Sequence, residues 1–234
     1  RWDWRPVDRL ADPVVLGLVV ALVGLTLVNW YGAATLHMKT YYSTKPLVMM
    51  VLIALFLYLR PGNPHEAPFL LGLVFSLGGD IALIPKSTRW FLVGLVLFLF
   101  AHIFYIWGFN QVHADLVISL IFIGLAGLLL FQLLRLIRVW MGRKPELKRM
   151  RNAFTAYAIF LAAMTVSALL CFLRPGWSFT AALHAAVGGL LFFVSDSLLA
   201  LDRMGKRIPR ARFMVITTYH LAQFLIVAAA LGMP

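Results

Sequence analysis

Long apolar stretches separated by short polar connections run along almost the whole chain. A helix needs about 20 mainly apolar residues to cross the hydrocarbon core of a bilayer. Breaks fall at helix-ending sequences such as Pro61-Gly62-Asn63-Pro64 and Arg174-Pro175-Gly176. Between the breaks we count eight stretches of suitable length, at about residues 13–31, 45–60, 67–85, 89–109, 115–138, 152–173, 178–201 and 211–232.

The pattern predicts an all-α polytopic membrane protein with one eight-helix transmembrane domain over residues 1–234. Lipid offers no partner to unpaired backbone groups, so each stretch must be helical. Composition agrees, because 62% of the residues are hydrophobic and only 13% are charged, whereas soluble domains average about 25% charged residues. The first residues mix both signs of charge, so we expect no cleavable signal there.

The formal net charge of +12 would suggest nucleic-acid binding in a soluble protein. Here the bases collect in the connections after the first, third, fifth and seventh stretches, a distribution that orients membrane proteins with those connections in the cytoplasm. We therefore expect both termini outside the cytoplasm, the inner membrane of a bacterium as the location, contact with membrane lipids and no nucleic acid. The oligomeric state stays open.

Two stretches carry an aspartate in otherwise apolar sequence, Asp80 within 72–83 and Asp196 within 188–199. A charged Asp at the bilayer centre costs about 2.5–3.5 kcal/mol, so such residues usually face a bundle interior and serve a function. Both stretches run toward the cytoplasm, and each Asp lies about five residues before its end, or ~7–8 Å below the cytoplasmic edge. We expect the two carboxylates to act together; the alternative is a structural ion pair or a helix cap.

The two acidic stretches also align with each other, Gly72 with Gly188 and Asp80 with Asp196. A tandem duplication of a four-helix unit would produce this alignment, because an even number of spans preserves the direction of the chain. Ser76 lies one turn before Asp80 and shares its face.

Other polar residues occur in the remaining stretches. Lys45 opens the second stretch at the cytoplasmic interface, where it could snorkel, neutralise a carboxylate or hold a phosphate. His102 and Tyr105 share one helix face, and Tyr219 and Gln223 share another. Hydrogen bonding between packed helices is the alternative for these two pairs.

Sequence motifs for metal binding are absent, with no His-Glu-x-x-His, no Cys-x-x-Cys and no His pair four residues apart. We therefore predict neither a metal nor another cofactor. A zinc site built from His102 and the two aspartates in three dimensions is left as an alternative.

Five short motifs, in this order and spacing, resemble those of the YhhN/TMEM86 family from the second stretch to the eighth. They are Thr44-Lys45-Pro46-Leu47, Phe75-Ser76-Leu77-Gly78-Gly79-Asp80, Phe98-Leu99-Phe100-Ala101-His102-Ile103-Phe104-Tyr105, Phe193-Val194-Ser195-Asp196 and Tyr219-His220-Leu221-Ala222-Gln223.

The resemblance implies an eight-span membrane hydrolase. Animal members are lysoplasmalogenases, which cleave the vinyl ether bond of lysoplasmenyl-ethanolamine or -choline into a fatty aldehyde and a glycerophospho-base. It implies a catalytic pair, Asp80 and Asp196, and a lysophospholipid-binding set around it. We expect that set to be Lys45, Ser76, His102, Tyr105, Tyr219 and Gln223.

The chemistry suits two carboxyl groups. Protonation of the vinyl β-carbon creates an oxocarbenium ion, water adds, and the hemiacetal collapses. Two close carboxyls share one proton, so the protonated group would be the general acid and the ionised group would stabilise the cation. The sequence does not assign these roles. Two alternatives stay open: a zinc-dependent intramembrane lipid hydrolase, and a non-enzymatic lipid or proton-coupled transporter.

The expected depth of the acids also places the lipid. Its headgroup would stay at the surface with the phosphate at Lys45, so loss of Lys45 would raise KM more than it lowers kcat. Its tail would run between the apolar faces at 73–75 and 190–193.

Overall fold

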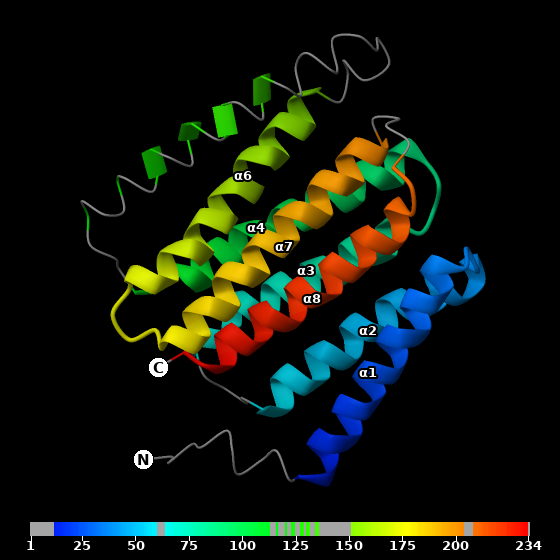
Figure 1. Ribbon diagram of the computed structural model, residues 1–234, viewed down its shortest axis with the longest axis horizontal. Coiled ribbons are helices and arrows are strands. Elements are labelled where there is room, and N and C mark those ends of the chain that lie inside the picture. The colour runs from blue at the N-terminus through cyan, green and yellow to red at the C-terminus, as the bar shows by residue number, and fades with distance from the viewer. Residues whose placement is uncertain are drawn as a thin grey trace.

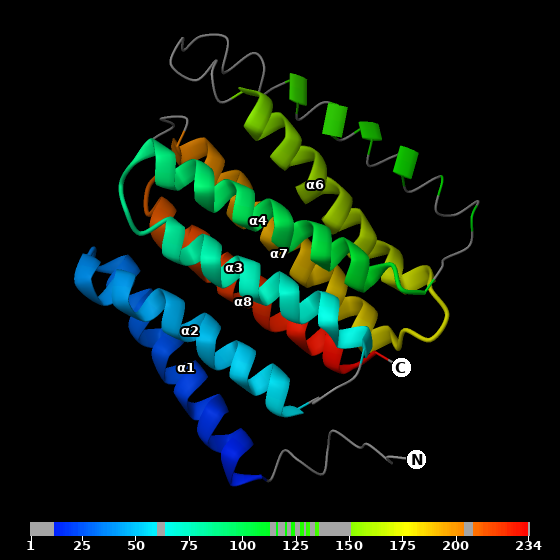
Figure 2. The same cartoon turned by 180° about the vertical axis from the view of Figure 1, so that it is seen from behind.

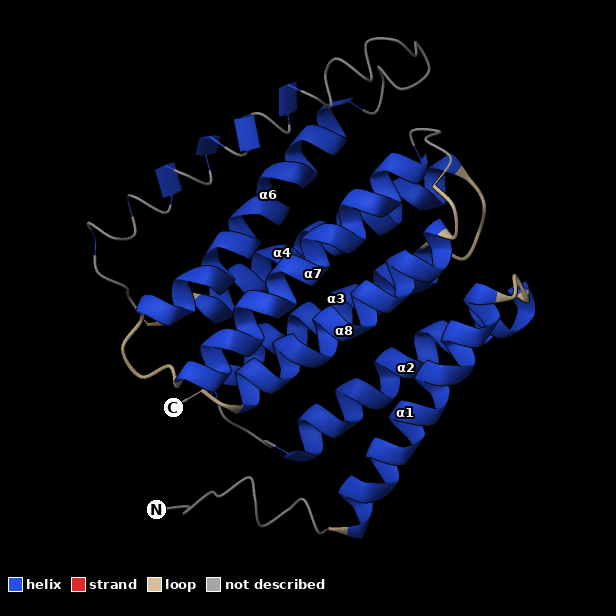
Figure 3. Cartoon of the chain, in the orientation of Figure 1, coloured by secondary structure: helices blue, strands red, loops and turns tan. Residues whose placement is uncertain are grey.

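The computed structural model describes residues 12–59, 64–112, 151–203 and 208–233, with scattered residues between 116 and 135 (Figure 1). Every regular element in these ranges is a helix, which confirms the all-α class (Figure 3). The α-helices are α1 (Pro13–Ala34), α2 (Met38–Leu59), α3 (Ala67–Ala82), α4 (Thr88–Phe109), α6 (Arg151–Leu169), α7 (Phe179–Arg203) and α8 (Ala211–Leu231). Two single-turn 3₁₀ helices, η2 (Pro64–Glu66) and η4 (Leu170–Leu173), precede α3 and extend α6.

Six helices of the described chain are long and apolar enough to cross a membrane, so the chain is an integral membrane protein. The predicted count of eight is not supported. The expected span at 115–138 lies largely outside the described residues. The expected span at 67–85 is the 16-residue helix α3, which stops at Ala82. We had counted Leu83 and Ile84 as helical because they are apolar, but Pro85 disfavours a helical conformation in the residue before it.

The start of α2 also differs from the prediction. The sequence predicts a short span at about 45–60 and leaves open an extension back toward Tyr41. The helix extends further, because it begins at Met38 and carries Pro46 in its interior. Lys45 therefore lies about two turns inside the helix and not at its end.

The helices pack largely as sequential pairs, α1 with α2, α3 with α4, and α7 with α8. Both views place the α1–α2 pair along one edge and α6 along the opposite edge, with the other four helices between them (Figures 1 and 2). The helices α1, α3 and α7 all end at the same end of the molecule, so α3 and α7 run in the same direction (Figure 1).

Two glycines of α3 bring the aromatic residues of α4 against its backbone. A Cβ atom added at Gly72 would lie 2.2 Å from Tyr105 Cε1, and one at Gly79 would lie 2.6 Å from Phe98 Cε2. Neither distance is tolerable, so α4 can approach α3 this closely only because both positions lack a side chain. This approach packs Tyr105 and Phe98 of α4 directly on the helix that carries Asp80.

Candidate active site

A cavity of about 330 Å³ lies at the end of the bundle where the three helix pairs turn. Asp80 and Asp196 both line it, together with residues of α2, α4 and α8. Exposed residues line its outer part, among them Lys86 in the α3–α4 connection and Asp202 in the last turn of α7, so the cavity reaches the surface. The two aspartates therefore share one compartment, although they belong to different helix pairs.

Asp80 is fully buried near the end of α3 and contacts two other helices. The Lys45 ammonium, from α2, lies 3.0 Å from Asp80 Oδ1. The Tyr219 hydroxyl, from α8, donates a 2.8 Å hydrogen bond to Asp80 Oδ2. One carboxylate thus carries a cation and a neutral donor, a combination that suits a buried ionised group.

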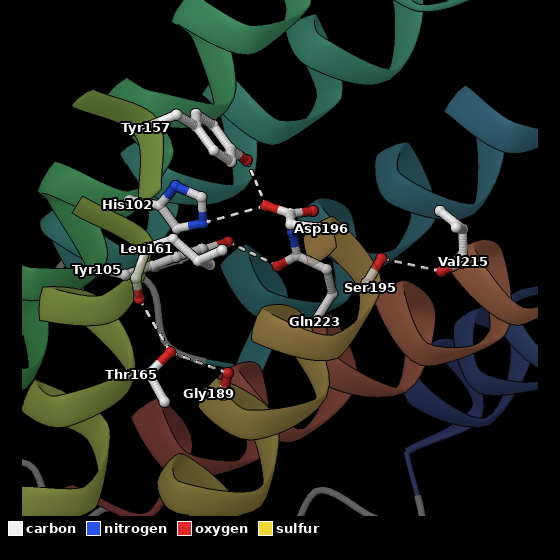
Figure 4. Close-up of polar contacts among 10 residues, drawn as sticks. All are labelled: His102, Tyr105, Tyr157, Leu161, Thr165, Gly189, Ser195, Asp196, Val215 and Gln223. Atoms are coloured by element: carbon white, nitrogen blue, oxygen red, sulfur yellow. Dashed lines mark hydrogen bonds and ion pairs between the residues drawn. The ribbon is translucent and has the colours of Figure 1, made fainter. Parts of the chain in front are cut away.

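Asp196 has different partners (Figure 4). The Tyr157 hydroxyl, from α6, donates a hydrogen bond to Asp196 Oδ2. His102 Nε2, from α4, lies 3.6 Å from the same oxygen. Within the described part of the chain, no lysine or arginine forms an ion pair with Asp196. Asp80 is therefore paired with a cation, whereas Asp196 is hydrogen-bonded to a neutral hydroxyl.

A group of buried polar residues lies next to the two acids without lining the cavity. The Tyr105 hydroxyl donates a 2.6 Å hydrogen bond to Gln223 Oε1, which joins α4 to α8 (Figure 4). The His102 ring lies edge-on to Tyr157 and to Phe192, with centroids 5.2 and 4.9 Å away. These side chains are closed off from solvent.

The predicted site residues divide into two groups. Lys45, Asp80, Asp196 and Tyr219 line the cavity. Ser76, His102, Tyr105 and Gln223 are fully buried and are absent from its lining. All of them lie in the same part of the bundle, but only the first group can touch a molecule in the cavity as it stands.

Three details of the predicted geometry are wrong. Asp80 lies in the last turn of α3, whereas Asp196 lies about two turns before the end of α7, so their distances from the helix ends differ. Lys45 was expected at the interface but is 7% exposed and paired with Asp80, which fits the alternative in which it neutralises a carboxylate and not the one in which it snorkels. The expected tail faces do not line the cavity, because Leu73 is fully buried and Leu190 lies on the outside of the bundle.

Tyr157 is a site residue that sequence reasoning missed. It lies in a stretch without any acid, and no spacing connects it to Asp196, 39 residues later. The sequence indicates Arg203 only as an orienting charge, and Arg212 also as a residue on roughly the same helix side as Tyr219. Neither is a predicted site residue, yet both line the cavity. Only the three-dimensional contacts identify these residues.

The described residues contain no group of three His, Cys, Asp or Glu side chains placed to hold a metal ion. His102 and Asp196 approach each other, but Asp80 is directed to Lys45 and Tyr219. A zinc site would therefore need a further ligand that the described part of the chain does not supply.

The model of the YhhN family matches residues 40–230 of the chain, a range that contains every residue of the site. The chain belongs to the YhhN family. Lysoplasmalogenase TMEM86B of Sus scrofa is 32% identical over 202 residues, which are 85% of this chain and 74% of that protein. Lysoplasmalogenase TMEM86A of Bos taurus is 30% identical over 174 residues, 72% of this chain and 67% of that protein. No solved structure matches the chain.

The YhhN relationship confirms the family predicted from the five motifs. The matched range begins at residue 40, so α1 lies outside it. In the structure α1 packs mainly on α2, where the Asn29 amide donates hydrogen bonds to Tyr41 O and Thr44 Oγ1. The helix that supplies Lys45 is thus supported from its outer side by a helix beyond the family match.

Proposed function

We propose that this YhhN protein is an intramembrane lysoplasmalogenase. It would hydrolyse the vinyl ether bond of lysoplasmenyl-ethanolamine or -choline, releasing a fatty aldehyde and a glycerophospho-base. The observation that carries this proposal is the pair of aspartates that line one cavity and differ in their charge partners. The names of the mammalian relatives support the substrate class.

The different partners of the two aspartates support an assignment of the roles that the sequence left open. Lys45 and Tyr219 compensate an ionised Asp80, so this residue is the standing carboxylate. Asp196 has no such cation among the described residues, and a buried carboxyl group without a compensating cation is more stable with its proton. Asp196 is therefore the general acid of the proposed reaction.

The reaction then proceeds with balanced proton transfers. Protonated Asp196 gives its proton to the vinyl β-carbon, which leaves an oxocarbenium ion beside two carboxylates. Water attacks the cationic carbon and gives a proton back to Asp196, forming a hemiacetal. Asp196 then relays the hemiacetal hydroxyl proton to the glycerol oxygen as the carbon–oxygen bond breaks. The aldehyde and the glycerophospho-base leave, and Asp196 is again protonated.

The same proposal covers the finer architecture. Residues 1–234 would form one eight-span domain, with a fifth span at 115–138 and two tandem four-helix units that contribute Asp80 and Asp196. Both termini would lie outside the cytoplasm of a bacterium, in its inner membrane. The bases Lys39, Lys86, Arg89, Arg203 and Arg210 at the cavity end support a cytoplasmic opening.

Mass spectrometry of purified protein given a mixed lysophospholipid pool tests the proposal. We expect fatty aldehyde from vinyl ether lipids and no loss of ester-linked lysolipids. Asp80→Asn and Asp196→Asn should each abolish turnover while leaving the protein folded, because the amide keeps the shape but transfers no proton. Asp12→Asn is the control, since Asp12 caps α1 at the other end of the bundle and Asn is also a good cap.

Two results would contradict the proposal. Full turnover by either active-site variant at matched expression would remove that aspartate from the mechanism. Lipid movement across liposomes without any aldehyde would favour a transporter in place of a hydrolase.

A further inference from the structure

The outer part of the cavity has a cationic rim. Its described lining includes three basic residues, Lys86, Arg203 and Arg212, and one acidic residue, Asp202. None of these charges belongs to the catalytic arrangement around the two aspartates. The rim is net positive and lies on the path between the surface and the acids.

Aromatic rings hold the two arginines in place. The Arg203 guanidinium carbon lies 4.7 Å from the centroid of the Phe91 ring, and that of Arg212 lies 5.7 Å from the centroid of Tyr41. A guanidinium stacked on a ring keeps its edge donors available, and it loses less freedom when it binds an anion. Phe91 and Tyr41 themselves line the cavity, so both cations are fixed at its wall.

Each arginine lies the same number of residues along its helix from a residue deep in the cavity. Arg203 follows Asp196 by seven residues on α7, and Arg212 precedes Tyr219 by seven on α8. Seven residues are about two turns, or ~10.5 Å, and return to the same helix face. Each helix thus presents a reactive or hydrogen-bonding group in the depth of the cavity and a guanidinium at its mouth.

This spacing fits a lysophospholipid. Five single bonds separate the sn-1 ether oxygen from the phosphorus, an extended span of about 6 Å. The lipid span is shorter than the ~10.5 Å between the two helix positions, and an arginine side chain is long enough to reach the phosphate across the difference. Lys45 cannot serve the phosphate in this arrangement, because its ammonium is buried against Asp80.

We propose that Arg203 and Arg212, with Lys86, form a subsite that binds the phosphate of the lysophospholipid headgroup. The inference rests on the proposed function, which places the vinyl ether bond at Asp196. The headgroup then binds residues that take no part in the proton transfers. Loss of one arginine should therefore weaken substrate binding and leave the bond-breaking step unchanged.

The test compares Arg212→Gln with Arg89→Gln, an exposed arginine at the same end that does not line the cavity. Each variant is assayed with a 1-alkenyl lysophospholipid and with 1-alkenylglycerol, which lacks the phosphate. For Arg212→Gln we expect KM for the phospholipid to rise about tenfold, equivalent to about 1.4 kcal/mol. We expect an unchanged kcat, an unchanged KM for the alkenylglycerol, and no effect of Arg89→Gln.

A binding measurement separates this inference from the proposed reaction. Saturated ether lysophospholipid cannot be cleaved as a vinyl ether, so its affinity in nanodiscs reports the subsite alone. Phosphate-dependent binding that Arg212→Gln weakens would support the subsite even if the protein cleaved no vinyl ether. Equal losses in Arg212→Gln and Arg89→Gln, or equal losses with the phosphate-free lipid, would overturn it. Tighter binding of inorganic phosphate than of the lipid would identify a free-anion site and would also overturn it.

Discussion

The buried ion pair between Lys45 and Asp80 gives the sharpest prediction. Lys45→Met removes the cation and keeps most of the volume of an unbranched side chain. The Asp80 carboxylate, 0% exposed, would then keep only the Tyr219 hydroxyl as a donor among the described contacts. Stability and turnover should both fall.

The magnitude follows from the burial of both partners. Breaking a buried ion pair by removing one partner costs about 3–5 kcal/mol, whereas replacing both partners by uncharged groups is often neutral. For a chain of this size 1 kcal/mol corresponds to about 2–4 °C in Tm, so a loss of 3 kcal/mol lowers Tm by roughly 6–12 °C. The double variant Lys45→Met/Asp80→Asn should recover most of that loss, because no charge is left buried without a partner.

The assay pairs thermal unfolding of detergent-purified variants with steady-state kinetics. We expect kcat of Lys45→Met to fall by about 100-fold, or ~2.7 kcal/mol of transition-state stabilisation, with KM nearly unchanged. The control is Lys39→Met, an exposed lysine on the same helix. An unchanged Tm together with a raised KM and an unchanged kcat would refute this reasoning. That result would instead indicate that Lys45 binds the phosphate of the substrate.

Two further predictions follow from the second acid and from the orientation. Tyr157→Phe removes the hydroxyl that donates to Asp196. In the proposed mechanism this bond strengthens when Asp196 gives up its proton, and a hydrogen bond to a charged group is worth about 1.5–3 kcal/mol, so we expect kcat to fall at least tenfold with KM unchanged; a fall in Tm alone would mean that Tyr157 only packs. A reporter that is active only in the cytoplasm should stay silent when fused to the C-terminus, and a strong signal would reverse the proposed topology and the side on which the cavity opens.

The sequence was sufficient to predict the class of the protein and to single out the two acids of the candidate site. An Asp within an apolar stretch is costly wherever it lies, so Asp80 and Asp196 were identifiable without a structure. The spacing of Tyr219 and Gln223 places both on one helix face but fits packing between helices equally well. Only the resemblance to the YhhN/TMEM86 motifs makes Tyr219 a candidate site residue.

Features that depend on contacts between helices could not be predicted in this way. Hydropathy extended α3 over Leu83 and Ile84, because apolar residues in a turn look the same as apolar residues in a helix. The depth of Lys45 depends on where α2 begins, and hydropathy leaves open whether the helix starts near Lys45 or extends back toward Tyr41. The role of Tyr157 depends on α6 packing beside α7, a contact that no spacing along the chain records.

The different partners of the two aspartates explain how similar sequences can serve different chemical roles. Asp80 and Asp196 lie in stretches that align with each other, on helices that run in the same direction. In the proposed duplication α2 and α6 occupy equivalent places, each packed beside an acidic helix. The first supplies the ammonium of Lys45 and the second supplies the neutral phenol of Tyr157. In the proposed mechanism one carboxyl group is therefore stabilised with a charge and the other with a proton, because the helices beside them differ and not because the acidic motifs do.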